Sequence, residues 1–394
     1  MSGMAGGRKC RAAMASLAGP GEAAVAATML NIMMTRPRSL ASRSDDQEGG
    51  GAPKKKGRNV DTERTQRASF SARLHTAPAA VTAAASPPSR EDAFAAYTHA
   101  LLWAITDDER HALKAIECLD GWPLAWTTPI DNANGLQVAW AGAVWPRAAE
   151  IIKHTYRAWP GADAFGAMLQ RLVVPMVDQG APINGNIGLV MTEAVLHAAV
   201  LTDNRSQFDA AIAMWRAQAR AYVYVSADGP LPARPPAQRY LNNTSPVCDP
   251  QCDDASLITY WHAQGVFGHD GICQESCRDF GHVELGYMTL VNSAETAWHQ
   301  GVDVYAEEQQ RLIAGAELHA SLLAAEPPGR RQPVPTWLCD GHVKGADNSS
   351  TWAMLHHHYT MRMGVATLPN VTAMLTSIRQ NSACWDQARA AGRP

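Results

Sequence analysis

The sequence predicts an all-α protein, and three observations support this fold class. Apolar residues recur at helical spacing in one segment after another between residues 90 and 366. Polar loops containing Gly, Pro, Asn and Asp separate these segments. The alternating pattern of a half-buried strand is confined to the short stretch YVYVS, residues 222–226. Periodicity alone leaves bundle, solenoid and toroid open, although no repeat of fixed length is visible.

The expected helices cover residues 90–105, 106–122, 145–159, 187–202, 206–225, 274–300, 309–326 and 349–366. The first is expected to bury one apolar face, formed by Phe94, Tyr97, Leu101 and Leu102. Asp107 is a candidate N-cap for the second helix, and Gly121 follows its end. Pro146 is expected at the start of the third helix, and Ser206 as the cap of the fifth.

Residues 1–90 have a different character from the rest of the chain. They are rich in Ala, Gly, Ser, Arg and Lys without a sustained apolar period, which predicts a leader and a disordered linker closing at Pro87-Pro88. The stretch AAVAATMLNIMM, residues 23–34, could be the apolar part of a secretion signal. The tract PKKKGR at residues 53–58 is read as solvated disorder rather than a nuclear signal. Residues 91–394 are then the folded domain.

Composition excludes some functions and leaves others open. The formal net charge of −3 gives no argument for nucleic acid or a membrane surface, and no run of eighteen apolar residues is present. Twelve Trp against six Phe fits either dense packing or stacking on sugar rings. Five Asn-x-Ser/Thr sites favour an exported protein and possible N-glycans, namely Asn204, Asn242, Asn243, Asn348 and Asn370.

The eight cysteines also favour export. They include two C-x3-C pairs, Cys248 with Cys252 and Cys273 with Cys277. Structural zinc usually prefers C-x2-C spacing, so disulfides of undetermined connectivity are expected instead of a metal site. Reduced, buried thiols are the alternative.

The densest group of polar residues is QESCRDFGH, residues 274–282. If this stretch is helical, Arg278 and His282 share one face, with Glu275 one turn earlier, whereas Asp279 points elsewhere. Solvated charges at a helix start are the simpler interpretation. However, a strongly apolar helix follows, and charges buried at its start need partners or a chemical role.

Two other groups carry less specific signals. Asn184 and Asn186 flank Gly185, a turn pattern that would also cap the next helix. The stretch HHHYTMR, residues 356–362, cannot direct three consecutive His to one metal, but Tyr359 and Arg362 could line a cleft. No nucleophile elbow, phosphate loop, dinucleotide fingerprint or HExxH motif is present. A pair of carboxylates for glycoside hydrolysis would leave no local signature.

Four stretches together resemble the alginate-lyase domain family of polysaccharide lyases. They are residues 136–156, 183–232 and 273–305, together with a late HY-x-x-R-x-G motif that fits His358, Tyr359, Arg362 and Gly364. The resemblance covers roughly residues 92–376, and QESCRDFGH is its most specific part.

The resemblance implies an (α/α) toroid that cleaves a uronate polysaccharide, alginate or glucuronan, by β-elimination without a cofactor or metal. In this chemistry, hydrogen bonds and positive charge neutralise the uronate carboxylate so that a base can remove the C5 proton. Arg278 and Asn186 would neutralise, His282 would be the base or an orienting group, and Tyr240 would be the acid. Residues expected to bind substrate are Asn184, Gln274, Glu275, Trp140, Trp261, His358, Tyr359 and Arg362.

Some features depart from the family pattern. Ile187 stands where family members often have Trp, and the cysteines of CDPQC look like an insertion. Tyr287 lies nine residues beyond Arg278, on about the opposite side of an ideal helix, and is a poor acid candidate. Two alternatives therefore stay open: a catalytically degenerate carbohydrate-binding or cell-wall protein, and an α/α-toroid glycoside hydrolase.

Overall fold

A computed structural model describes residues 90–128, 135–157, 159–178, 185–236, 248–323, 333–344, 351–365 and 367–377. The leader and linker predictions for residues 1–89 lie outside this part of the chain. The α-helices are α4 (Arg90–Thr106), α5 (Glu109–Ala125), α6 (Gly135–Thr155), α7 (Ala162–Met168), α8 (Val174–Asp178), α9 (Gly185–Leu201), α10 (Arg205–Tyr222), α11 (Asp254–Tyr260), α12 (Phe280–His299), α13 (Val304–Glu307), α14 (Gln309–Leu323) and α15 (Thr351–His357). Short π and 3-10 turns complete them, among them η4 (His358–Arg362), and a last helical segment covers 369–377.

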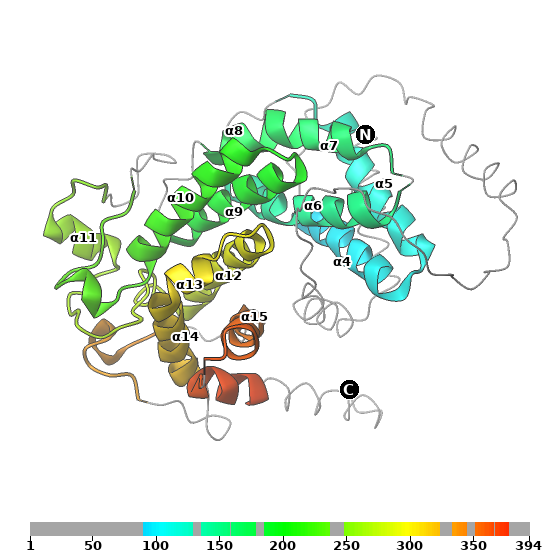
Figure 1. The fold of residues 1–394 in the computed structure, drawn as a ribbon. Coiled ribbons are helices and arrows are strands. Elements are labelled where there is room, and N and C mark those ends of the chain that lie inside the picture. Colours follow the sequence, from blue (N-terminus) through cyan, green and yellow to red (C-terminus); the bar gives the residue numbers. More distant parts are fainter. Residues whose placement is uncertain are drawn as a thin grey trace, which may run out of the picture.

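The all-α prediction is confirmed, since helices make up the regular structure of the described residues. The ribbons follow an arc from α4 and α5 at one end, through α6 and α9, to α12, α14 and α15 at the other (Figure 1). Helix α6 packs against α4 and α9, and α9 packs in turn against α10 and α12. Closure of this arc into a toroid is not established and stays a prediction.

The buried face of α4 agrees with the predicted one only in part, since Leu101 is 2% exposed and Tyr97 packs against the core. Ala93, Ala96 and Ala100 have no exposed surface, whereas the Phe94 side chain is 43% exposed. Small side chains allow α4 to approach α6 closely along its length. The period of the large apolar residues therefore indicated the helix and part of the face that it buries, but not the contribution of the alanines.

Helix ends also differ from the predicted ones. Asp107 has a φ of 57°, so it ends α4 in the left-handed region, and Asp108 caps α5 instead. Helix α10 is capped by Asn204, whose side chain accepts a hydrogen bond from the Gln207 N–H, rather than by Ser206. Pro146 lies inside α6, because burial of the whole helix outweighs the cost of one missing N–H. Helix α5 runs on past Gly121 to Ala125.

The stretch QESCR is not helical. It forms a turn segment, and helix α12 begins only at Phe280. YVYVS does not form a strand either, but it attaches this turn segment to the end of α10. The N–H of Gln274 donates to the Tyr222 carbonyl at 2.7 Å, and an isolated bridge joins Val223 to Cys273. The backbone around Glu275 is thus held before α12 starts.

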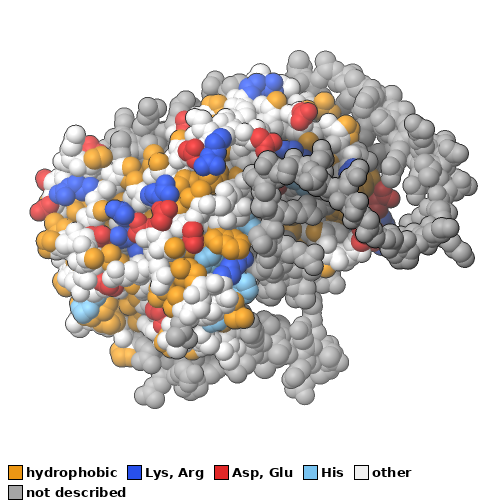
Figure 2. Space-filling view, viewed as in Figure 1, with side chains coloured by type: hydrophobic (Ala, Val, Ile, Leu, Met, Phe, Trp, Pro, Cys, Tyr) orange, Lys and Arg blue, Asp and Glu red, His pale blue; other side chains and the backbone are white. Residues whose placement is uncertain are grey.

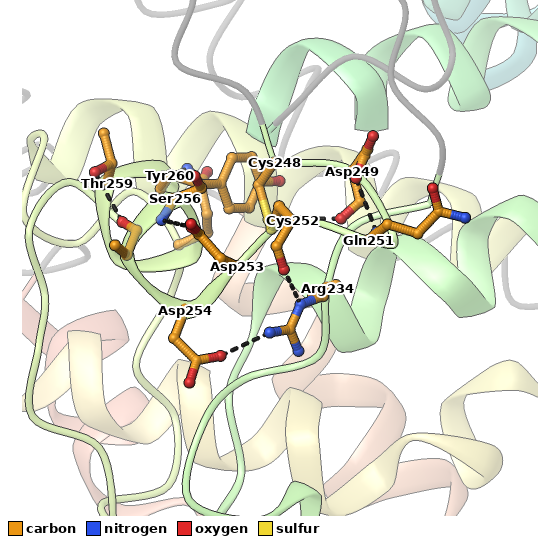
Figure 3. The surroundings of a disulfide bond; sticks show 12 residues. Arg234, Cys248, Asp249, Gln251, Cys252, Asp253, Asp254, Ser256, Thr259 and Tyr260 are labelled. Atoms are coloured by element: carbon orange, nitrogen blue, oxygen red, sulfur yellow. Dashed lines mark hydrogen bonds and ion pairs between the residues drawn. A yellow bond between two sulfur atoms is a disulfide. The ribbon is translucent and has the colours of Figure 1, made fainter.

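Two disulfides lie in the loops around this segment. Cys277 is bonded to Cys339, which ties the turn segment to residues 333–344, and Cys248 is bonded to Cys252. Beside the second disulfide, the Arg234 guanidinium donates hydrogen bonds to the Cys252 carbonyl and the Asp254 carboxylate (Figure 3). Cys273 is a buried free thiol, so it is not bonded to Cys277. No cluster of metal-ligating side chains is found among the described residues.

Charged side chains of both signs are interspersed over the face seen in Figure 2 rather than gathered in one patch. No helix in the described ranges is long and apolar enough to cross a membrane.

Candidate active site

The candidate site is formed where the start of α9 meets the turn segment before α12. At its base lies the carboxylate of Glu275, which is 3% exposed. It accepts hydrogen bonds from the Asn186 backbone N–H at 3.0 Å and from the Asn186 side-chain amide at 3.0 and 3.1 Å. Because the first N–H groups of a helix lack intrahelical partners, Glu275 acts as a cap for α9.

Two more donors complete the surroundings of this carboxylate. The Tyr222 hydroxyl donates to it at 3.1 Å, and Arg278 forms an ion pair with it at 2.9 Å. Burial raises the pKa of Glu275, while the charge of Arg278 and the Asn186 N–H oppose the rise. A carboxylate with this many donors is a rigid support for the groups around it.

Gly185 allows α9 and the turn segment to approach this closely. Its φ of +52° is left-handed, and a Cβ there would lie 2.8 Å from the Gln274 Oε1 atom and 2.9 Å from the Glu275 Cδ atom. Gln274 is itself buried, and its amide donates to the Tyr260 carbonyl. Gln274 therefore holds α11 against the site.

Arg278 and His282 form the accessible side of the site. The Arg278 side chain is 40% exposed, and its ion pair with Glu275 occupies one Nη atom. His282, which is 33% exposed, lies at the start of α12 with its Nδ1 atom 2.6 Å from Asp279 Oδ2. Asp279 also caps α12 by accepting the His282 N–H at 2.9 Å. With Nδ1 directed at Asp279, Nε2 is left for other contacts.

The prediction that Asp279 points away from His282 is wrong. It assumes that residues 278–282 form one helix, whereas α12 begins after Asp279. The N-cap spacing of Asp279 and His282 was the available signal. The role of Tyr222 had no local signal, because this residue lies 53 residues before Glu275.

The tyrosines beside the site are unsuited to removing protons. Burial, followed by the charge of Glu275, raises the pKa of Tyr222 well above its ordinary value. Burial also raises the pKa of Tyr260, whose hydroxyl lies against the Gly185 N–H. Tyr287, doubted on helical geometry, is fully buried in the core. Tyr240 and Asn184 lie outside the described residues, so their predicted roles stay predictions.

The remaining predicted binding residues do not join this site. Trp140 is 8% exposed in α6, and Trp261 has no exposed surface. His358 and Tyr359 are likewise fully buried. In this structure these side chains have almost no surface with which to contact a polymer.

Arg362 belongs to a separate ion-pair network. Its guanidinium binds the Glu295 carboxylate through two hydrogen bonds, at 2.8 and 3.0 Å, and lies 4.0 Å from the centre of the Trp298 ring. Hydrogen bonds from His299 and Arg362 overcome the effect of burial and lower the pKa of Glu295 to about 2. This network joins η4 to α12. In this structure Arg362 is therefore an ion-pair partner of Glu295, and its side chain is 13% exposed.

A third group of polar residues lies between α6, α9 and α12. The Glu193 carboxylate accepts a hydrogen bond from the Asn292 amide at 3.0 Å and lies 3.6 Å from Arg147. Burial nevertheless raises the pKa of Glu193 to about 7. Its side chain is 1% exposed, so it is out of reach of a polymer.

In a comparison with protein families, residues 54–234 match the model of the alginate lyase family. The resemblance to the alginate-lyase domain family is thereby confirmed over this stretch, and it supports a polysaccharide lyase. Comparisons with curated proteins and with solved structures gave no match.

The matched range differs from the one expected from the motifs. It begins at residue 54, inside the predicted linker, and ends before the turn segment that carries Arg278. Asn186 lies within it, whereas Arg278 and His282 do not. The roles of these two residues therefore depend on the motif resemblance and on the geometry of the site.

Proposed function

We propose that the protein is a secreted polysaccharide lyase that cleaves a uronate-containing polysaccharide, alginate or glucuronan, by β-elimination. The products would be oligosaccharides with a C4–C5 double bond. The observation that carries this proposal is the half-exposed guanidinium of Arg278, fixed by a buried carboxylate beside the Asp279–His282 pair. The family match supports the substrate class. The predicted signal-like segment and the N-glycosylation motifs support export.

Arg278 would neutralise the carboxylate of the uronate bound in the site. That carboxylate must carry extra negative charge when the C5 proton leaves, so a fixed guanidinium stabilises the transition state more than the ground state. The ion pair with Glu275 orients Arg278 and leaves part of its N–H donors for the substrate. His282, oriented by Asp279, would hydrogen-bond the same sugar unit through Nε2.

Asn186 would act through Glu275. Its amide N–H groups already point at the Glu275 carboxylate, so direct donation to substrate would require that contact to break. We therefore assign Asn186 a positioning role: it fixes Glu275, and Glu275 fixes Arg278. A hydrolase is less well supported, because Glu275 is buried and Asp279 is bonded to His282, so neither carboxyl group is free to protonate a glycosidic oxygen.

The test is ultraviolet absorbance of the unsaturated product during incubation with alginate and with glucuronan. The wild-type protein should give rising absorbance with at least one polymer, and Arg278→Ala should lower kcat/KM by at least about 100-fold. The exposed Arg205→Ala, on α10, is the matched control and should retain wild-type rates.

Other outcomes have defined meanings. New reducing ends without absorbance would indicate hydrolysis and would reject elimination. Polymer binding without cleavage would favour the carbohydrate-binding alternative. Wild-type turnover by Arg278→Ala would reject the role of Arg278.

A further inference from the structure

A second arginine, Arg147, lies where four helices meet. It projects from α6, and its side chain is 20% exposed. Its guanidinium lies 5.0 Å from the centre of the Tyr97 ring of α4 and 3.6 Å from the Glu193 carboxylate of α9. The same carboxylate oxygen accepts the Asn292 amide of α12 at 3.0 Å. Side chains of α4, α6, α9 and α12 are therefore gathered around this one cation.

These four helices form one layer of the molecule. Helices α4, α6, α9 and α12 follow the inner side of the arc, whereas α7, α8 and α10 follow its outer side (Figure 1). Helix α6 packs against both α4 and α9, and α9 packs against α12. Because Arg147 contacts α4 and α9 at once and shares Glu193 with α12, it lies within this inner layer and not against the outer helices.

The guanidinium of Arg147 has unused hydrogen-bond donors. Arginine carries five N–H donors, and a separation of 3.6 Å from Glu193 is too long for a hydrogen bond. The Nε atom is buried and has no acceptor among the described residues. The Tyr97 ring supplies cation–π attraction only. Arg278 and Arg362, in contrast, each donate to a carboxylate. A partly buried guanidinium without acceptors is suited to bind an anion.

Glu193 is a weak competitor for such an anion. Burial raises its pKa to about 7, so near neutral pH roughly half of the molecules carry a neutral Glu193. The other titratable group beside this carboxylate is His197, whose Nδ1 atom lies 3.9 Å away. Burial lowers the pKa of His197 to about 3, which leaves its ring uncharged. Much of the positive charge of Arg147 is therefore available to a ligand.

Helix α9 connects this cation to the candidate site. Asn186 and Glu193 are seven residues apart in α9, so they share one face and lie about 10 Å apart along the helix axis. Asn186 contacts Glu275, which holds Arg278, and Glu193 contacts Arg147. Two guanidinium groups are thus held against the same face of one helix, two turns apart.

We propose that Arg147 forms a second anionic subsite, which binds the carboxylate of another uronate unit while Arg278 binds the unit that is cleaved. The choice of ligand rests on the proposed lyase function. A uronate polymer carries a carboxylate on every uronate unit, so one chain can contact both guanidinium groups. Arginine binds carboxylates through two parallel N–H donors, and Arg147 has such donors unused. The subsite adds affinity for long chains and leaves the chemical step unchanged.

The test uses matched variants, because removal of Arg147 alone would also deprive Glu193 of its cation. Glu193→Gln is the reference protein. Arg147→Met combined with Glu193→Gln differs from it only in the guanidinium, and thermal unfolding checks that the two are equally well folded. Arg147→Lys combined with Glu193→Gln is a milder form that keeps the charge but loses the two-donor geometry. Arg216→Met with Glu307→Gln removes an exposed arginine–glutamate pair and is the control.

The readout is the dependence of KM on chain length. With the long polymer that the wild type cleaves, KM of the Arg147→Met double variant should be about tenfold or more above that of Glu193→Gln, at equal kcat. The Arg147→Lys double variant should lie between them. With the shortest oligosaccharide that is cleaved, all three should have the same KM, because such a chain does not reach Arg147. Isothermal titration calorimetry measures the same loss of affinity without turnover.

Other results overturn the subsite. Equal KM values for the long polymer in all three proteins would do so while leaving the lyase function intact. A fall in kcat at every chain length would show that Arg147 only supports the fold of the site.

Failure of the lyase function itself is distinguishable. If the wild-type protein gives no unsaturated product, calorimetry with alginate and glucuronan still decides about Arg147. Polymer binding that is lost with the guanidinium would support the subsite on a non-catalytic protein. Binding that is independent of Arg147, or no binding at all, would overturn it.

Discussion

The buried carboxylate of Glu275 accepts both the backbone N–H and the side-chain amide of Asn186, a residue 89 positions earlier in the chain. This contact joins the start of α9 to the turn segment before α12. It also places Arg278, on the same carboxylate, at a fixed position. The proposed chemistry therefore depends on Glu275, a buried residue that substrate does not reach.

Glu275→Gln tests this dependence. Glutamine keeps the shape but removes the charge that holds Arg278. We expect kcat to fall by about 10- to 100-fold, because a small misplacement of a catalytic group has effects of this size. The melting temperature should fall to some extent, because the glutamine amide cannot accept all the hydrogen bonds that the carboxylate accepts from Asn186, Tyr222 and Arg278, so kcat is compared well below the unfolding transition. Glu117→Gln, a surface substitution in α5, is the control. Unchanged kcat in Glu275→Gln would show that Arg278 needs no such support.

Asp279→Asn separates helix capping from orientation of His282. Asparagine caps helices about as well as aspartate, so the melting temperature should stay the same. The contact with the His282 ring loses its charge, and we expect kcat/KM to fall by about tenfold or more. Asp108→Asn, at the equivalent cap of α5, should change neither quantity. The product absorbance assay and thermal unfolding measure both. A loss of stability without a loss of rate would contradict the role given to Asp279.

Glu193 should make stability depend on pH. Burial raises its pKa from 4.5 to about 7, so the folded state binds a proton more tightly than the unfolded state. Its contribution to stability is present below pH 4.5 and is lost as the pH rises to 7 and beyond, with a total effect on the order of 3 kcal/mol. Glu193→Gln should remove this part of the pH dependence and be the more stable protein at pH 8. Urea unfolding at pH 5 and pH 8 measures the difference, and parallel curves for the two proteins would contradict it.

Arg362→Ala should be strongly destabilising. The Glu295 carboxylate, which is 8% exposed, would lose its bidentate partner. Loss of one member of a buried ion pair costs about 3–5 kcal/mol. Arg205→Ala breaks an exposed pair and should cost less than about 1 kcal/mol. Urea unfolding compares the two. If Arg362→Ala instead keeps its stability but loses polymer binding, the predicted substrate-binding role of Arg362 is correct.

Periodicity was sufficient to predict the helices but not their ends. Segments such as 187–202 and 309–326 lie within two or three residues of α9 and α14, because long apolar patterns identify a helix well. Caps were missed at Asp108 and Asn204, which lie one and two residues from the predicted positions and have the required backbone conformation. Only the folded backbone decides between nearby polar residues.

The candidate site was predicted in part, through motif resemblance. Asn186, Glu275 and Arg278 do lie together, although they were expected to bind substrate rather than one another. Tyr222 could not be found from the sequence, because its contact with Glu275 depends on how distant segments pack. The HY-x-x-R motif shows the opposite case: a recognisable pattern whose residues are buried in an ion-pair network.

The bond between Cys277 and Cys339 has a consequence for how the protein is made. Arg278 follows directly after one end of a covalent link that spans 62 residues, so its surroundings are complete only after residue 339 has been synthesised and oxidised. In a reducing compartment this disulfide would not form, even if the helices had formed. Heterologous production should therefore be directed to the periplasm or the endoplasmic reticulum. In protein made in a reducing cytosol, the helices should be well folded, but the turn segment that carries Arg278 should be less firmly held.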